Sequence, residues 1–170
     1  MRHTSSFLFL VLNDVAKLKA NQMKYILPFL LVPTFVFAEP VIPVEDRVAS
    51  LLTGAQESCV IDGGVLELSG EEVVRYDFDK DGETDLTVLH EIDYKCSSSA
   101  SLFQGTAGAV AHLMTKTDYS YGYARAVDVV NAFNNVPVIL LGIHGMSCDE
   151  AGYINCVQAI TVHEGRFVSP

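Results

Sequence analysis

The residues best suited to chemistry are four aspartates within nine positions. Residues 77–85 read Asp-Phe-Asp-Lys-Asp-Gly-Glu-Thr-Asp, and Leu86 follows. Four carboxylates this close together repel one another, and an ordinary surface turn gains nothing from that repulsion. A hard divalent cation reverses the sign of the interaction, because calcium takes six to eight oxygen ligands and carboxylates at alternate loop positions can face one ion. The spacing therefore predicts a cation site.

The predicted site holds one Ca²⁺, with water completing the coordination shell. Its ligands are the side-chain oxygens of four residues and the backbone carbonyl of a fifth, namely Asp77, Asp79, Asp81, Asp85 and Glu83. Gly82 occupies the sixth loop position, where the chain must turn sharply and glycine adopts the unusual backbone angles at little steric cost. The alternative is a solvated acidic turn, since turns rich in Asp and Gly are common.

The loop resembles the calcium loops of EF-hand proteins and, more closely, those of FG-GAP and VCBS repeats in secreted and surface proteins. An EF-hand loop has a bidentate Glu at position 12, where this chain has Val88, and the segments on both sides here are typical of strands rather than helices. The FG-GAP-like loop ends with Asp at position 9 and then Leu, which Asp85 and Leu86 match. The resemblance implies an ion site but no propeller, because one loop cannot supply several blades. The chain looks like small exported bacterial domains with two disulfides and one such loop.

Composition limits the classes of partner. The chain has 170 residues, 49% of them hydrophobic, with 21 acidic side chains against 11 basic ones, and this length suits one domain. A nucleic-acid binder needs clustered Lys and Arg to contact phosphates, which this chain lacks. An anionic membrane surface is disfavoured for the same reason.

The N-terminal residues are typical of a targeting signal. Residues 25–38 carry no charge, follow Met23 and Lys24, and end with small-residue positions Val36 and Ala38. Such a run is too short for a spanning helix of about 20 residues and suits a cleavable secretory signal. We expect residues 1–38 to be an N-terminal extension plus signal peptide, with translation starting at Met23 as the simplest account of residues 1–22. An uncleaved signal anchor is the alternative.

We expect the mature chain, without a transmembrane segment, to be periplasmic or secreted. It has 20 acidic and 7 basic side chains, a net charge of −13, and all four cysteines. An even number of cysteines in an oxidising compartment favours two disulfides. Of three possible pairings, we prefer Cys59 with Cys96 and Cys148 with Cys156, because the second pair flanks a short glycine-containing segment. A zinc site is the alternative, but no C-x2-4-C spacing is present.

The apolar pattern predicts a single, mostly β, antiparallel domain, sandwich- or barrel-like, after one short helix. Residues 39–54 are a leader and a helix over 44–53, with Gly54 at the C-cap position. Residues 55–170 form the β domain, where short apolar runs alternate with turn signals. The expected strands cover residues 59–61, 65–68, 73–76, 86–92, 109–115, 123–133, 138–143, 154–162 and 166–168, with hairpin turns at 62–64 and 164–165.

Parts of this pattern are less distinct. Residues 123–133 fit a helix nearly as well as the strand that we assign to them. Residues 97–101 and 117–122 read as loops. The alternating Tyr119, Tyr121 and Tyr123 would nevertheless place three rings on one face of an extended segment, as a strand edge or a recognition surface.

No further motif specifies a reaction. We expect each histidine of the mature chain to be a hydrogen-bonded core or rim residue, and His144, Ser147 and Asp149 crowd one turn rather than forming a triad. The sequence favours an exported, calcium-binding interaction module without catalytic activity, with a protein partner in the envelope. An inhibitor of a cationic lytic enzyme is an alternative that suits the acidic charge. A secreted hydrolase that uses His144 or paired acids is another.

Overall fold

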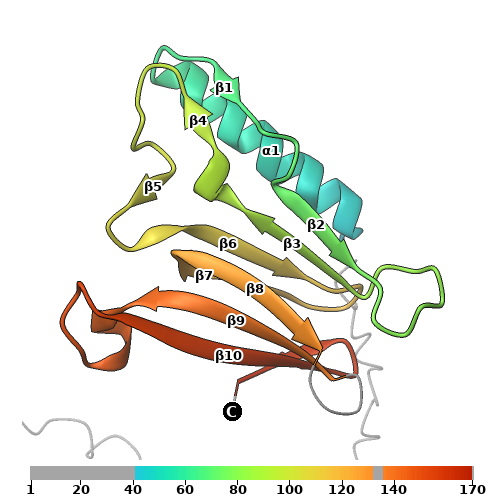
Figure 1. Ribbon diagram of the computed structural model, residues 1–170. Helices are drawn as coiled ribbons and strands as arrows, with labels where there is room; N and C mark the ends of the chain where they lie inside the picture. Colours follow the sequence, from blue (N-terminus) through green and yellow to red (C-terminus); the bar gives the residue numbers. More distant parts are fainter. Residues whose placement is uncertain (1–40, 132–135, 170) are drawn as a thin grey trace, which may run out of the picture. The chain divides into compact units, whose positions relative to one another are not determined.

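The computed structural model describes residues 41–131 and 136–169 (Figure 1). Within these residues one helix precedes a set of antiparallel strands, which confirms the mostly β fold. The elements are α1 (Val44–Ile61), β1 (Leu66–Glu67), β2 (Val73–Tyr76), β3 (Leu86–His90), β4 (Lys95–Cys96), β5 (Gln104–Gly105), β6 (Gly108–Met114), β7 (Tyr119–Ala124), β8 (Ala126–Asn131), β9 (Pro137–His144), β10 (Asn155–His163) and β11 (Arg166–Val168). Two short 3-10 helices, η2 (Glu91–Asp93) and η4 (Gly145–Cys148), lie in the connections.

The strands form two main sheets and one small one. In the first sheet β3 lies between β2 and β6, and β6 also pairs with β5 and β7. The second sheet has the order β11-β10-β9-β8, and β1 pairs with β4 separately. Only Arg125 separates β7 from β8, so the chain passes directly from one sheet to the other. Neither sheet closes on itself, and the fold is therefore sandwich-like rather than a barrel.

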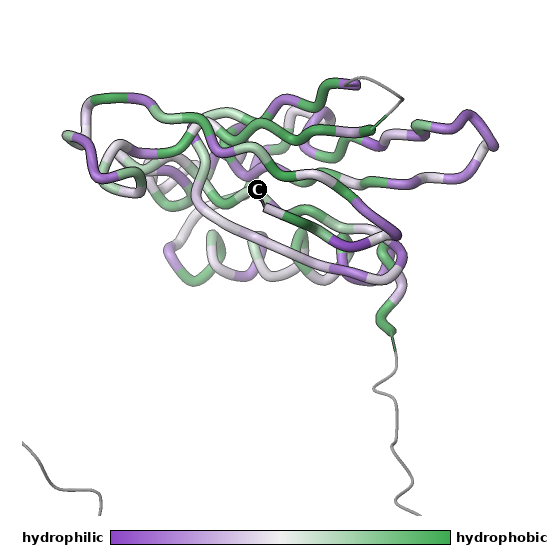
Figure 2. Tube along the Cα trace, turned by 90° about the horizontal axis from the view of Figure 1, so that it is seen from below, coloured by the Kyte–Doolittle hydropathy of each residue, from purple (hydrophilic) through white to green (hydrophobic). Residues whose placement is uncertain are grey.

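The core lies on both faces of the first sheet. On one face, Leu86 and Leu113 cluster with Ile139 and Leu141 of the second sheet. On the other face, Leu89 of β3 and Met114 of β6 belong to a second cluster that includes residues of α1. Four of the five residues of β3 and six of the seven residues of β6 are buried as a result. Figure 2 shows how hydrophobic and hydrophilic stretches alternate along the backbone.

The predicted helix was too short, and the hairpin predicted after it was wrong. Helix α1 passes through Gly54 and ends at Ile61, so residues 59–61 are its last turn rather than a strand. The apolar stripe explains the extension, because Val48, Ala55 and Cys59 are all buried on one side of the helix. A mid-helix glycine costs about 1 kcal/mol, which this burial offsets. Residues 62–64 then terminate the helix, and β1 pairs with β4.

The remaining strand predictions are confirmed, with shifts of a residue or two at their ends. One predicted loop is confirmed only in part. Residues 73–76 and 166–168 match β2 and β11 exactly as bounded, and the turn at 164–165 joins β10 to β11. The loop predicted at 117–122 is confirmed only for residues 117–118, because β7 begins at Tyr119 and pairs along β6. The strand assigned to 123–133 is present as the end of β7 and as β8, while 132–133 lie outside the described residues.

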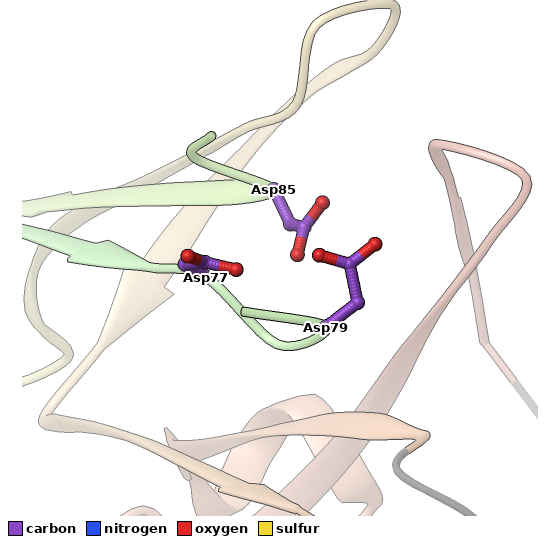
Figure 3. Close-up of side chains that lie close together, drawn as sticks. All are labelled: Asp77, Asp79 and Asp85. Carbon is purple, nitrogen blue, oxygen red and sulfur yellow. The ribbon is translucent and has the colours of Figure 1, made fainter. Parts of the chain in front are cut away.

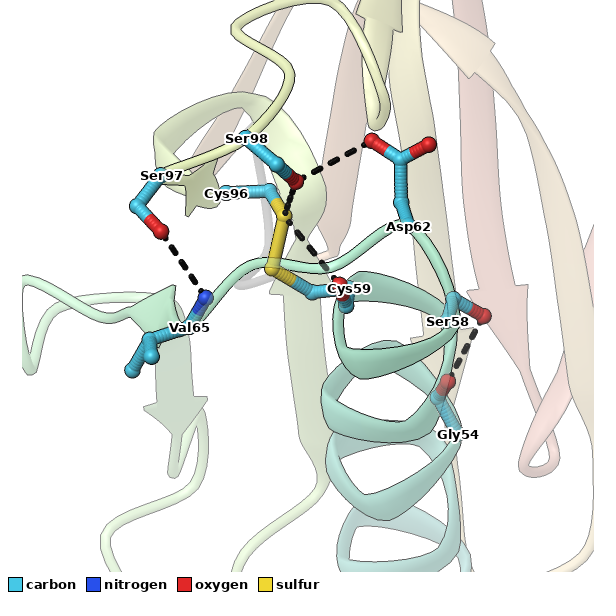
Figure 4. The surroundings of a disulfide bond; sticks show 8 residues. All are labelled: Gly54, Ser58, Cys59, Asp62, Val65, Cys96, Ser97 and Ser98. Atoms are coloured by element: carbon cyan, nitrogen blue, oxygen red, sulfur yellow. Dashed lines mark hydrogen bonds between the residues drawn. A yellow bond between two sulfur atoms is a disulfide. The ribbon is translucent and has the colours of Figure 1, made fainter.

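Both preferred disulfides are present. Cys59 in α1 bonds to Cys96 in β4, and Cys148 in η4 bonds to Cys156 in β10. Figure 4 shows that the first bridge is supported by hydrogen bonds, since Ser98 Oγ donates to Asp62 Oδ2 (3.1 Å) and Val65 N donates to Ser97 Oγ (2.9 Å). The last turn of α1 is thereby fixed to the segment after β4.

The predicted extension and signal at 1–38, including the start at Met23, lie outside the described residues. Among the described residues, no helix is both long enough and apolar enough to cross a membrane. The two disulfides are consistent with folding in an oxidising, extracytoplasmic compartment.

The two disulfides differ in the length of chain that they close, 37 against 8 residues of sequence separation. From loop entropy, we expect replacing Cys59 and Cys96 by Ala to lower the free energy of unfolding by about 4 kcal/mol, and replacing Cys148 and Cys156 by about 2.5 kcal/mol. Urea unfolding of both double variants measures the difference, with reduced wild-type protein as control. A larger loss for the Cys148/Cys156 variant would contradict the loop-entropy account.

Candidate metal site

The acidic loop is the connection of the β2–β3 hairpin. Tyr76 and Leu86 are the last paired residues of the two strands, and Asp85 N donates to Tyr76 O at 2.9 Å just beyond them. The Leu86 side chain is fully buried, whereas most of the loop is exposed. A fixed pair of strands therefore holds both ends of an otherwise solvent-facing loop.

Three of the predicted ligands come together in this loop. Asp77, Asp79 and Asp85 each offer a carboxylate oxygen, and these oxygens lie within 4.8 Å of one another. Figure 3 shows the carboxylates of Asp79 and Asp85 facing each other, with Asp77 beside them. Asp77 and Asp79 are exposed and Asp85 is half-buried. This group could hold a metal ion.

Backbone amides hold the three carboxylates in place. Asp77 accepts hydrogen bonds from Lys80 N (2.6 Å) and Gly82 N (3.0 Å). Asp79 Oδ1 accepts one from Asp81 N (3.1 Å), and Asp85 Oδ2 accepts one from Phe78 N (2.7 Å). Gly82 has φ +91°, which confirms the sharp turn expected at the sixth position. The loop is thus folded around its own acidic side chains.

The side chains of the other two predicted ligands, Asp81 and Glu83, lie outside this group of three carboxylates. Asp81 Oδ1 accepts a hydrogen bond from Glu83 N at 2.7 Å, and its side chain is not part of the three-carboxylate group. The Glu83 carboxylate pairs with Lys116 in the β6–β7 turn. The role predicted for Glu83 is that of its backbone carbonyl, and the ion pair with Lys116 does not use that atom.

The loop is electrostatically strained by its own charge. The amide of Asp81 lowers the pKa of Asp79, but loss of hydration and the charges of Asp81, Asp85 and Asp77 together outweigh it, so the pKa of Asp79 is raised. The hydrogen bond to Glu83, together with the nearby carboxylates, raises the pKa of Lys116. A cation among the three aspartates would remove the repulsion that raises the pKa of Asp79.

Sequence reasoning missed a partly buried polar cluster, centred on His112, on the helix-covered face of the first sheet. His112 Nε2 lies 3.0 Å from Glu91 Oε1, and His112 Nδ1 lies 2.8 Å from the hydroxyl of Tyr119. The guanidinium of Arg47 in α1 lies 4.4 Å from the centre of the Tyr119 ring. The pairing β6–β7 could have suggested the His112–Tyr119 contact, but nothing in the sequence points to Glu91.

The environments of His90, His112 and His144 agree with the hydrogen-bonded roles expected for them, whereas His163 is exposed. His90 Nε2 lies 3.1 Å from Ala124 O, and His144 Nδ1 accepts a long hydrogen bond from Met146 N at 3.4 Å. His144 directly precedes η4, and Ser147 is one of the four residues of this 3-10 helix. These contacts position loops and strand ends.

Comparison with protein-family models, curated protein sequences and solved structures finds no match to this chain.

His90 makes stability depend on pH. Burial lowers its pKa, although the Ala124 carbonyl, Asp93 and Glu91 act in the opposite direction. Because the unfolded chain then takes up a proton at higher pH than the folded one, stability is highest above the ordinary His value and falls as pH drops from about 7.5 to 5.5.

We expect His90→Gln to flatten this pH dependence and His163→Gln, at an exposed position, to leave it unchanged. Urea unfolding of the three proteins at both pH values measures the effect. If wild type and His90→Gln lose the same stability between the higher and the lower pH, His90 does not contribute to the pH dependence.

Proposed function

We propose that this protein is an exported, calcium-binding interaction module stabilised by two disulfides. The observation that carries the proposal is the convergence of the Asp77, Asp79 and Asp85 carboxylates at the end of the β2–β3 hairpin. The resemblance of residues 77–85 to FG-GAP-like calcium loops supports the same conclusion. Calcium would stabilise this end of the sandwich and keep the loop in one conformation.

The donor set favours calcium over other common metals. All three converging ligands are carboxylate oxygens, without nitrogen or sulfur, which disfavours zinc. Water and the Glu83 carbonyl can raise the number of oxygens toward what calcium needs, and the exposed loop imposes no rigid octahedral cage of the kind that selects magnesium. Without a bidentate Glu at position 12, the dissociation constant is expected at about 10⁻⁴ to 10⁻³ M, the range of extracellular modules.

Inhibition of a cationic lytic enzyme is a second candidate function. It is favoured by the charge of the described residues, which include 19 Asp and Glu but only 7 Lys and Arg. An acidic module accelerates its encounter with a cationic partner and repels anionic ones. Tight, salt-sensitive binding to a cationic lysozyme would distinguish this function from a general interaction role.

Calcium should stabilise the folded protein. At about 10 mM calcium, the expected dissociation constants correspond to about 1.4 to 2.7 kcal/mol of stabilisation, because only the folded loop brings the three carboxylates together. Thermal unfolding of chelator-stripped protein with added calcium or magnesium measures it, and magnesium should raise the melting temperature much less.

A matched pair of double variants tests whether the loop is responsible. Asp79→Asn with Asp85→Asn should abolish the calcium-dependent shift, since two of the three converging carboxylates lose their charge. Glu57→Gln with Glu67→Gln removes the same charge from exposed positions on α1 and β1 and should leave the shift unchanged. A shift lost equally in both variants, or absent from wild type, would refute the site.

A further inference from the structure

A cleft opens between the two sheets beside β7. Its volume is about 570 Å³, within the range of ligand-binding pockets. Leu113 of β6 and Leu141 and Ile160 of the second sheet contribute to its apolar lining, and Ser120 and Gly122 face it from β7. Tyr121 and Tyr123 contribute as well and remain 69% and 65% exposed.

The composition of β7 explains why the sandwich is open here. Its sequence is Tyr-Ser-Tyr-Gly-Tyr-Ala, so alternation places the three tyrosines on one face and small residues on the face toward the second sheet. Small inward side chains leave the space over Leu113 and Ile160 unfilled. An added Cβ at Gly122 would meet no atom within 4 Å. The cleft is thus present because the inward side chains of β7 are small, and a larger residue at position 122 has room in it.

The strands beside the cleft have unpaired edges. Among the described strands, β7 pairs only with β6. Within the part of the chain that the structure describes, the residues of β10 before Thr161 pair with β9 alone, because β11 covers no more than Thr161–His163. An unpaired edge presents backbone donors and acceptors that an extended segment of another chain can satisfy.

The tyrosines beside the edge form an anchored row. Tyr119 is held by its hydroxyl contact with His112, and the Tyr119 and Tyr121 rings stack with centres 5.8 Å apart. Tyr121 and Tyr123 therefore present aromatic surface from a fixed strand, and exposed tyrosines are enriched at protein interfaces.

The charge beside the cleft is negative. No residue in its lining is charged, while Asp149 and Glu150 are exposed directly after Cys148, which is part of that lining. The basic residues that flank β7 are already paired, Lys116 with Glu83 and Arg125 with the carbonyls of Thr106 and Gly152.

Building on the proposed interaction role, we propose that the β7 edge and its cleft bind an extended, cationic segment of a partner protein. The segment adds to β7 through backbone hydrogen bonds, places an apolar side chain in the cleft, and directs Lys or Arg side chains toward Asp149 and Glu150. A second copy of this chain fits less well, because its own excess of acidic residues repels the same surface.

Synthetic peptides test the chemistry of this occupant. The probes are an alternating Lys/Val peptide of about ten residues, long enough to span a typical strand, the same peptide with Glu in place of Lys, and a Lys/Val peptide N-methylated at alternate residues. NMR titration of the isotope-labelled, disulfide-bonded protein should show amide shifts along β7 and the first half of β10 with the first peptide alone. N-methylation of the peptide amides that would donate to the β7 edge should weaken binding at least about tenfold.

Two glycine variants separate the cleft from general surface effects. Gly122→Leu should fill the cleft and weaken the Lys/Val peptide at least about tenfold. Gly105→Leu is the matched control, because an added Cβ at Gly105 also meets no atom within 4 Å and Gly105 is not part of the lining. Unchanged thermal stability of both variants shows that folding is not the cause. Asp149→Asn with Glu150→Gln should weaken binding about threefold and lower its salt dependence.

Several results would overturn the proposal. The first is no binding of the Lys/Val peptide at a peptide concentration of about 1 mM. The others are equal binding of the Glu peptide, amide shifts confined to residues 77–85, and self-association through β7. A medium-chain fatty acid that shifts the cleft amides when the peptide does not would make this a small-molecule pocket. Repeating the titration in chelator keeps the two proposals apart, since loss of the calcium-dependent thermal shift refutes the calcium site and leaves peptide binding to be judged separately.

Discussion

Burial of β3 and β6 on both faces is the constraint on which the rest of the structure depends. Their pairing places Val88 opposite Leu113, toward the second sheet, and Thr87 opposite Met114, toward the helix. A shift of register by one residue would exchange the two faces and disrupt both hydrophobic clusters at once. This register is therefore strongly specified, and through the hairpins on either side it also fixes where the acidic loop begins and which residues of β7 face inward.

The same constraint explains how the chain tolerates two locally unfavourable features. The aspartates of residues 77–85 repel one another, but the loop is closed by a strand whose first residue, Leu86, is fully buried. The inner face of β7 has small residues that pack poorly, but β7 is held along its length by β6. In both cases the central strands supply the stability that tolerates the unfavourable local sequence.

The parts of the fold that follow from local pattern were predictable, and those that depend on distant contacts were not. Strand β2, the Cys148–Cys156 bridge and the grouping of Asp77, Asp79 and Asp85 each have a short-range signal in the sequence. Residues 59–61 form a short apolar run that fits a strand or a buried helix equally, and only packing against the sheet decides. The contact of His112 with Glu91, 21 residues apart, arises from the β3–β6 pairing and the η2 turn. The cleft depends on what faces β7 from the second sheet, which no local pattern encodes.

Among the described residues, an exposed ion pair connects the acidic loop of residues 77–85 with the turn before β7, and the strength of this pair limits how far the two regions can influence each other. Lys116 lies in the turn just before β7 and pairs with Glu83 of the loop, with both side chains more than half exposed. Exposed pairs of this kind contribute about 0 to 1 kcal/mol, so coupling through this pair changes partner affinity by about fivefold at most. Because β6 and β7 are already ordered by the core, a cation bound among the loop aspartates would stabilise the domain and would change the β7 edge little.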